Sequence, residues 1–143
     1  MDGIYNALKS GGKVLLQMGG YGNAKDIFKA LDVTIKKYED YFNNFESPYT
    51  FHTEEFYKKL LNQYRFKDYD VKLVKKDMIH KDIDAFKGWL RTTWFPYTDQ
   101  LPENLREEFL DDLVQNYLKL VPLDSSNRVH IDMVRLEVMV EKE

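Results

Sequence analysis

One short stretch of the sequence combines a positive charge with large aromatic side chains. Arg91 lies between Trp89 and Trp94, and Tyr97 follows within one helical turn. An arginine guanidinium can hold a carboxylate through two parallel hydrogen bonds, and aromatic rings commonly form the apolar walls of ligand pockets. The stretch is therefore a candidate site for a small molecule that carries a carboxylate.

Residues elsewhere in the chain can extend this pocket. The candidate substrate-binding set is Arg91, Trp94, Tyr97, Tyr49, Phe51 and Thr92. Each member also has a structural alternative. Arg91 can pair on the surface with Asp84 or Glu107, the aromatic rings can be ordinary core residues, and the Thr92 hydroxyl can bond to nearby backbone.

The three histidines are weaker candidates. His130 and Asp132 share one face of a predicted strand, where they could hold a metal or act as a proton-transfer pair, but no third ligand is apparent. His52 lies near the expected rim of the pocket and could act as a general base. Packing or exposed roles remain the simpler interpretation, so the sequence assigns no metal ligand and no catalytic residue.

Composition narrows the class of protein. The 143 residues are 43% apolar and 15% aromatic, which fits a single folded domain over residues 1–143. Cysteine is absent, which excludes disulfides and thiolate chemistry. The net charge of −3 argues against a nucleic-acid partner. Because no long apolar run or leader pattern is apparent, we expect a cytoplasmic protein without a membrane partner.

Three segments are predicted to be strands. Lys13–Met18 is an apolar run between glycines, which is typical of a strand buried on both faces. Residues 71–79 alternate imperfectly. Residues 129–140 alternate clearly, but the parity changes at Met133 and Val134, which predicts a β-bulge there.

Helices are predicted between these strands. Asn23, Thr53 and Asp82 are suitable N-caps for helices that follow them, because their side chains can accept from free backbone amides. Pro102 suits the first turn of a helix that runs to about Leu120.

Several segments, taken in order, are similar to the second half of class I S-adenosylmethionine-dependent methyltransferases. Ala7–Leu15 resembles the "ALKPGG" turn that leads into the family's fifth strand, and Gln17–Gly20 resembles the end of that strand. Phe51–Leu61 is similar to the helix before the sixth strand, and Val134–Val138 to the last strand. Trp89–Trp94 resembles the substrate-capping insertion of the trans-aconitate methyltransferase-like branch.

The resemblance implies an α/β fold with part of a Rossmann-like sheet: family strands 5, 6 and 7, the last antiparallel, with flanking helices. Residues 81–120 would form a helical, lid-like insertion between the last two strands. S-adenosylmethionine would be the cofactor of the intact family. Met18 and Gly19 would border it, because ligands of open α/β sheets bind at the carboxyl ends of strands.

The cofactor-binding motif of the family has no counterpart in this sequence. The cluster Gly19–Gly22 does not fit the G-x-G-x-x-G spacing and is better interpreted as a tight turn. We therefore expect this chain alone to bind S-adenosylmethionine weakly or not at all and to be inactive by itself.

A buried strand with one free edge also predicts association, because an apolar edge can pair with another chain. The expected partner is a second copy, as a homodimer, or a separately encoded N-terminal methyltransferase half. Two alternatives remain open. The chain can be a non-catalytic module that completes or regulates another methyltransferase, or it can be a gene remnant or a segment of a longer protein.

Overall fold

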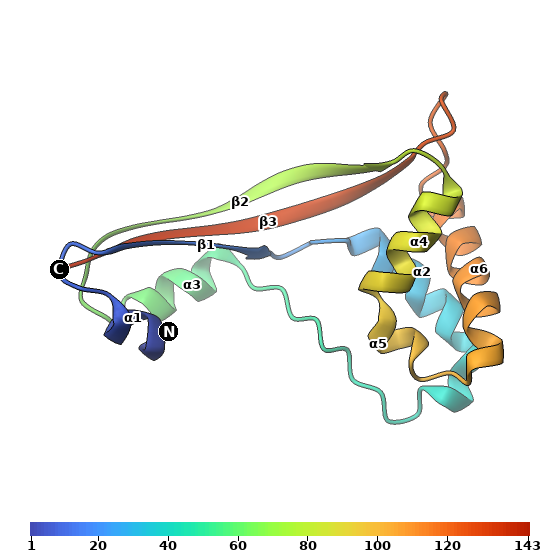
Figure 1. Ribbon diagram of the computed structural model, residues 1–143, viewed down its shortest axis with the longest axis horizontal. Coiled ribbons are helices and arrows are strands. Elements are labelled where there is room, and N and C mark those ends of the chain that lie inside the picture. Colours follow the sequence, from blue (N-terminus) through green and yellow to red (C-terminus); the bar gives the residue numbers. More distant parts are fainter. The chain divides into compact units, whose positions relative to one another are not determined.

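The computed structural model describes all 143 residues, which form two compact units. Unit 1 contains Met1–Asn23, Phe51–Lys76 and Met133–Glu143. Unit 2 contains Ala24–Thr50 and Asp77–Asp132. Figure 1 shows the strands and helices of both units. Whether residues 1–143 behave as a single domain stays a prediction.

Unit 1 is built on a three-stranded sheet. The strands are β1 (Lys13–Gly19), β2 (Phe66–His80) and β3 (Val129–Lys142), in the order β1-β3-β2. β1 and β3 are antiparallel, with Lys13 opposite Glu141 and Gly19 opposite Arg135. The predicted strands and the antiparallel last strand are therefore confirmed, although β2 is longer than predicted. The numbering as family strands 5, 6 and 7 stays a prediction.

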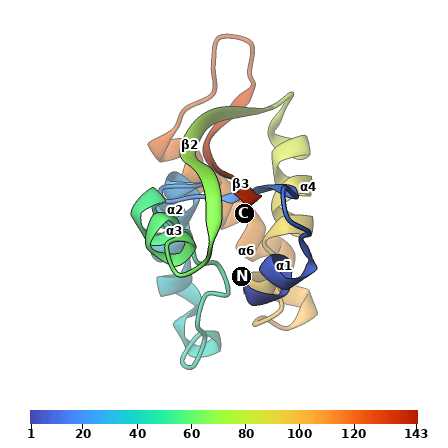
Figure 2. The ribbon, with the colours of Figure 1, turned by 90° about the vertical axis from the view of Figure 1, so that its left-hand side faces the viewer.

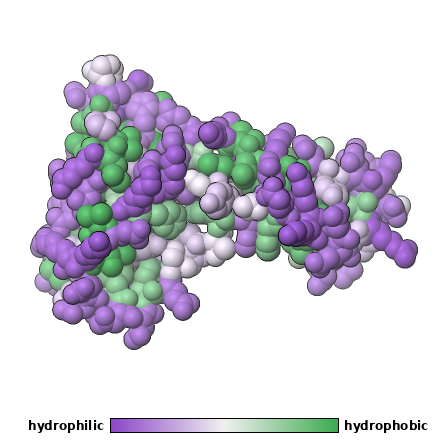
Figure 3. Space-filling model, turned by 180° about the vertical axis from the view of Figure 1, so that it is seen from behind, coloured by the Kyte–Doolittle hydropathy of each residue, from purple (hydrophilic) through white to green (hydrophobic).

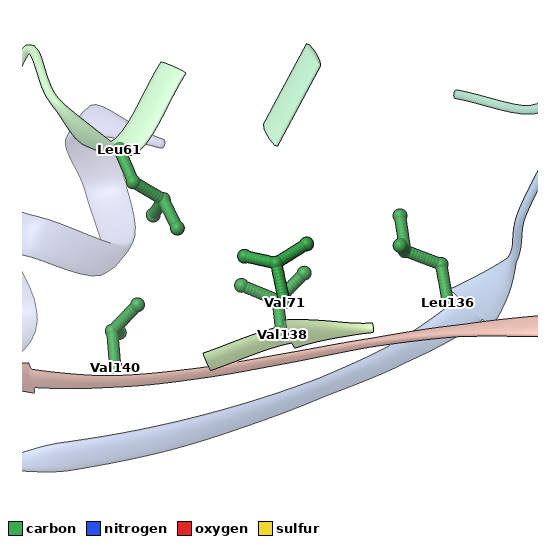
Figure 4. Packing of buried hydrophobic residues seen from close by; sticks show 5 residues of the cluster. All are labelled: Leu61, Val71, Leu136, Val138 and Val140. Carbon is green, nitrogen blue, oxygen red and sulfur yellow. The ribbon is translucent and has the colours of Figure 1, made fainter. Parts of the chain in front are cut away.

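One face of this sheet is covered by helices. The helices α1 (Asp2–Ala7) and α3 (Glu54–Leu61) lie on the same side of the strands (Figures 1 and 2). The buried core between the layers is aliphatic, and Figure 4 shows its members: Leu61, Val71, Leu136, Val138 and Val140. Val14, Leu16 and Met18 of β1 pack against it, which fixes the inward face of that strand.

The prediction that the first strand is buried on both faces is wrong. Exposure alternates along β1, and the side chain of Leu15 is 58% exposed. Met139, its direct partner on β3, is 51% exposed and lies on the same face. The reason is that the helices of unit 1 cover only the opposite face of the sheet.

Two of the three predicted helix caps are confirmed. Thr53 accepts from the backbone amide of Phe56, and Asp82 accepts from that of Ala85. The Asn23 prediction is wrong, because its side-chain oxygen accepts from the backbone amide of Val134 at 2.8 Å. The next helix instead begins after Ala24, which has a positive φ of 51° and makes no side-chain cap.

Unit 2 is helical. Its helices are α2 (Lys25–Ile35), the 3-10 helix η1 (Lys36–Tyr41), α4 (Ile83–Thr93), α5 (Phe95–Thr98) and α6 (Glu103–Leu120). α6 packs against α2 and α4, and α5 contacts both α4 and α6. The predicted insertion 81–120 between the last two strands therefore consists of α4, α5 and α6, while its function as a lid stays a prediction.

The parity of burial along β3 changes as predicted. Val129 and Ile131 are buried, whereas further along Leu136 and Val138 are the buried positions. The β-bulge itself stays a prediction.

Seen from behind, the molecule shows apolar surface scattered among polar side chains (Figure 3). No helix combines the length and the apolar character needed to cross a lipid bilayer.

Candidate functional site

Three of the predicted substrate-binding residues meet in unit 2. Tyr49, Trp94 and Tyr97 belong to a set of rings that we call the aromatic cluster. Its other members are Phe28, Phe42, Phe45 and Trp89. The Trp94 ring centroid lies 5.1 Å from that of Tyr49, 5.8 Å from that of Tyr97 and 5.1 Å from that of Phe28. Tilted and edge-to-face pairs of this kind are favourable arrangements of aromatic rings.

The two tyrosine hydroxyls of the cluster already have partners. Tyr97 donates to the Ser47 hydroxyl at 2.9 Å, and Tyr49 donates to the backbone carbonyl of Thr93. Burial raises the pKa of both tyrosines above the ordinary value, so both hydroxyls are protonated at neutral pH. These bonds fix the orientation of the two rings around Trp94.

The indole N–H of Trp94 has no partner. Its Nε1 atom is buried and makes no hydrogen bond, and the residue as a whole is only 3% exposed. A buried donor without a partner typically costs about 1–3 kcal/mol, and buried tryptophan N–H groups are usually bonded. The Trp94 N–H is therefore an unused donor among apolar side chains. The sequence predicts Trp94 only as part of a pocket wall, not as a donor.

Arg91 takes the alternative that pairs it with an acidic residue. Its Nε and one terminal nitrogen each donate to a carboxylate oxygen of Glu107 at 2.9 Å, and Asp84 is not its partner. This hydrogen bond, together with one from Lys87, lowers the pKa of Glu107 to about 2. Arg91 lines a hollow of about 540 Å³ with Phe95, Thr98, Asp99, Glu103, Arg106, Glu107 and Leu110. It is outside the aromatic cluster, and binding a substrate carboxylate would require it to leave Glu107.

Thr92 also takes its structural alternative. Its hydroxyl donates to the backbone carbonyls of Gly88 and Trp89, at 3.3 and 3.2 Å. Bonds of this kind to the preceding helical turn are common for threonine inside helices. The hydroxyl is exposed and committed to its own helix, so its part in substrate binding stays a prediction.

The remaining predicted residues, Met18, Gly19 and Phe51, meet in unit 1 at the carboxyl end of β1. A Cβ at Gly19 would lie 2.5 Å from the Phe51 ring, and one at Gly20 would lie 2.4 Å from Leu73. The Tyr57 hydroxyl approaches the Met18 sulfur at 2.9 Å. Both glycines thus permit close packing of protein side chains at this strand end. A role of Met18 and Gly19 at the cofactor border stays a prediction.

A shallow hollow opens beside the same strand end. It measures about 230 Å³ and is lined by Gln17, Met18, Gly19, Asn23, Lys76, Met133, Val134 and Arg135. Arg135 is ion-paired with Glu137 at 2.6 Å. The Gly20 backbone forms an isolated parallel bridge with His52, whose ring stacks on Phe56 at 3.8 Å. His52 is thus held near this strand end, and both its place at the rim of a pocket and its role as a base stay predictions.

The other two histidines have different surroundings. Burial lowers the pKa of His80, whose Nε2 is buried without a partner. His130 does not pair with Asp132, which instead forms an ion pair with Lys25. The His130 ring lies between Asp77 and Asp124, and no group of three side chains in the chain could hold a metal ion. Sequence periodicity gave no signal for these two partners, because one belongs to β2 and the other to a loop.

The sheet and helices define a coarse class. An α/β arrangement with an antiparallel last strand between its two neighbours is compatible with part of a methyltransferase fold. No protein-family model matches the chain.

A curated relative supports the same class. The chain is 27% identical over 119 residues to juvenile hormone acid O-methyltransferase of Drosophila melanogaster. The match covers 80% of this chain, and the chain spans about 40% of the length of that relative. The similarity supports a methyltransferase-like domain.

Proposed function

We propose that this chain is the acceptor side of an S-adenosylmethionine-dependent methyltransferase that methylates an apolar carboxylic acid. The observation that carries the proposal is the similarity to an enzyme named for O-methylation of an acid. The aromatic cluster adds to it, because the buried Trp94 offers one unused donor among apolar rings. A ligand with an apolar body and one carboxylate would be complementary to such a set of side chains.

The chemistry asked of this chain is positioning and exclusion of water. In the intact family, a methyl group passes from the cofactor's sulfonium to a nucleophile of the acceptor, which in the reaction proposed here is a carboxylate oxygen. Aromatic walls that remove water strengthen a carboxylate's interaction with a nearby donor and hold it in one orientation. Trp94 Nε1 is the donor that we assign to one carboxylate oxygen. Arg91 is assigned a lesser role, because Glu107 already occupies its guanidinium.

We further propose that the cofactor is not bound by this chain alone. Gly19 and Gly20 are closed by Phe51 and by Leu73 with Leu136, and their spacing does not suit a dinucleotide-type loop. The helices of residues 81–120 would cover the acceptor, as the insertion of the trans-aconitate methyltransferase-like branch does. The aromatic walls favour an acid with a large apolar body over a small polar acid.

Binding of dodecanoate, with dodecanol as the matched alcohol, tests the acceptor assignment. The chain has two tryptophans, so Trp94→Phe and Trp89→Phe leave one reporter each for fluorescence titration. We expect dodecanoate to bind more tightly than dodecanol, and Trp94→Phe to remove that preference while Trp89→Phe keeps it. Equal binding of acid and alcohol by the unaltered chain would contradict the assignment.

The alternative function is that of a partner subunit that completes or regulates another methyltransferase. The observation in its favour is the open face and edge of the sheet in unit 1, where Leu15 and Met139 lie opposite each other and are half exposed. Such surface is suited to a homodimer or to a separately encoded N-terminal half. Light scattering after size-exclusion chromatography tests it: a dimer is expected for self-association, and a strict monomer that captures no methyltransferase from its host would contradict both forms.

A further inference from the structure

The ring of His130 is held by two carboxylates at once. Its Nδ1 lies 2.7 Å from Asp77 and its Nε2 lies 2.9 Å from Asp124. A neutral imidazole carries only one N–H, so it can donate to one carboxylate and must turn a lone pair toward the other. The observed geometry, with a carboxylate at each ring nitrogen, therefore belongs to the protonated imidazolium.

The two carboxylates differ in how firmly they are placed. Asp124 accepts from the backbone amides of Ser126 and Arg128 at 2.8 and 2.9 Å, and its second oxygen also accepts from Arg128 Nε at 2.8 Å. Asp77 is ion-paired with His130, and its side chain is 50% exposed. When His130 loses its proton, it can keep the bond to the fixed Asp124, and Asp77 is then the group that is released.

These three residues lie where the helical insertion is joined to the strands. Asp77 lies on β2, shortly before Lys81, the first residue of the insertion. Asp124 lies shortly after Leu120, the last residue of the insertion. The two ends lie side by side, because one hollow is lined by Asp82, Ile83 and Asp84 from the first end and by Leu123 and Asn127 from the second. The His130 ring thus bridges the beginning and the end of the insertion.

We propose that protonated His130 reinforces the join between the two ends of the helical insertion 81–120, which the pairing of β2 with β3 also holds, and that loss of the imidazole proton releases Asp77 at the first end. The other groups that face this bridge do not replace it. The Arg128 guanidinium is bonded to Asp124, the Tyr117 hydroxyl of α6 donates to the His130 backbone carbonyl at 2.6 Å, and Asp132 is paired with Lys25. If residues 81–120 cover an acceptor, as the proposed function requires, their attachment is then loosened at alkaline pH.

The direction of the pH effect follows from the charges. The hydrogen bonds to Asp124 and then to Asp77 raise the pKa of His130 above its ordinary value of about 6.5. The bridge is therefore fully formed below that ordinary value and is lost as pH rises through the raised pKa. His130, followed by the Arg128 amide, lowers the pKa of Asp124, so Asp124 loses its charge only in strong acid.

Amide hydrogen exchange of the full chain at pH 6 and pH 9 tests the bridge, with rates divided by those of unstructured peptides of the same sequence. We expect protection of residues 77–85 to fall by about two- to fivefold at the higher pH, the scale of an exposed ion pair. His130→Gln should show, at both pH 6 and pH 9, the low protection that the native chain shows at pH 9. His52→Gln should keep the pH response of the native chain. An unchanged protection ratio in the native chain, or a full response in His130→Gln, would overturn the proposal.

A titration of the His130 ring by NMR gives a readout that does not depend on the stability of a histidine variant. We expect a midpoint above about 6.5 and a lower midpoint in Asp77→Asn, where the amide cannot attract the imidazolium as a carboxylate does. A midpoint at or below the ordinary value, or no change in Asp77→Asn, would overturn the proposal. This readout is separate from the proposed function, which fails or stands on acid binding.

Discussion

The two units of this chain are filled with different kinds of side chain. The core of unit 1 is aliphatic and consists of residues such as Leu136 and Val138 between a sheet and two short helices. The core of unit 2 is rich in rings, among them Phe86, Phe109 and Tyr117, all of which are fully buried. An aliphatic core has no polar group to satisfy, whereas tyrosine and tryptophan bring hydroxyl and N–H groups into the interior. Unit 2 therefore carries polar ring groups in its interior that each need a partner, whereas the five core residues of unit 1 carry none.

Most polar ring groups of this aromatic core have a hydrogen-bond partner within the chain. Tyr117 donates to the backbone of His130, and Tyr97 donates to Ser47. Tyr38 donates to Asp112, and burial together with this bond raises its pKa to about 12. Trp94 Nε1 and His80 Nε2 are the exceptions, since both are buried without a partner. The comparison therefore rests on whether Trp94 is a ligand donor or an ordinary core residue.

The largest expected effect is the loss of a ring from unit 2. Phe109 is fully buried, stacks on Phe42 and meets the Tyr38 ring edge-on. Phe109→Ala should lower the free energy of unfolding by about 3–5 kcal/mol, because the cavity cannot refill. Urea denaturation followed by circular dichroism measures it. Phe95→Ala, at a residue that is 54% exposed, is the matched control and should change stability by less than about 0.5 kcal/mol.

Removal of a buried side chain from unit 1 should lower the free energy of unfolding somewhat less, on average, than removal of a ring from unit 2. Leu136→Ala removes a fully buried side chain from the aliphatic core and should cost about 2–5 kcal/mol. Leu15→Ala, on the open face of the same sheet, should cost far less because that side chain is 58% exposed. The same urea titration separates them. Equal costs for the two leucines would mean that the open face is covered in solution, as the association proposal requires.

A methyl group added beside β1 should destabilise unit 1 moderately. A Cβ at Gly20 would lie 3.0 Å from the Leu136 Cβ and 3.2 Å from its backbone nitrogen. Gly20→Ala should therefore cost about 1–3 kcal/mol, as overpacking usually does. Gly88→Ala in α4 meets nothing within 4 Å and should stabilise its helix by about 0.5–1 kcal/mol. In thermal unfolding, the melting temperature should fall for Gly20→Ala and rise for Gly88→Ala.

The smallest expected effect concerns Arg91 and Glu107, whose side chains are 49% and 58% exposed. Glu107→Gln should cost at most about 1 kcal/mol at neutral pH. Because its pKa is lowered from 4.5 to about 2, the contribution of Glu107 is present above the ordinary value and disappears as pH falls through this range. Stability curves of the native chain and Glu107→Gln should therefore converge near pH 2. A constant difference would show that Arg91 does not interact with Glu107 in solution.

Local sequence signals predicted local structure well. Thr53 and Asp82 were identified as caps because a cap depends on residues a few positions away, and both are confirmed. Asn23 failed because its oxygen is used by Val134, which is distant in sequence. The same limit applies to the exposed face of β1, which depends on which helices cover the sheet. It applies as well to the two partners of His130, which come from β2 and a loop.

The candidate site was predicted less completely than the fold. Tyr49, Trp94 and Tyr97 do meet in one cluster, which the aromatic content of the stretch suggested. Arg91 had two possible acidic partners in the sequence, and only the packing of α4 against α6 selects Glu107. An unused buried donor such as Trp94 Nε1 leaves no mark in a sequence, because it is defined by the absence of a neighbour in space.

The most direct test of the central claim is a parallel calorimetric titration of the purified chain with S-adenosylhomocysteine and with dodecanoate. If the chain is the acceptor side of a methyltransferase, dodecanoate should bind and S-adenosylhomocysteine should give no measurable heat. Low-micromolar binding of S-adenosylhomocysteine together with no binding of the acid would contradict the account. The chain would then provide a cofactor site, and the aromatic cluster of unit 2 would be a core without a ligand.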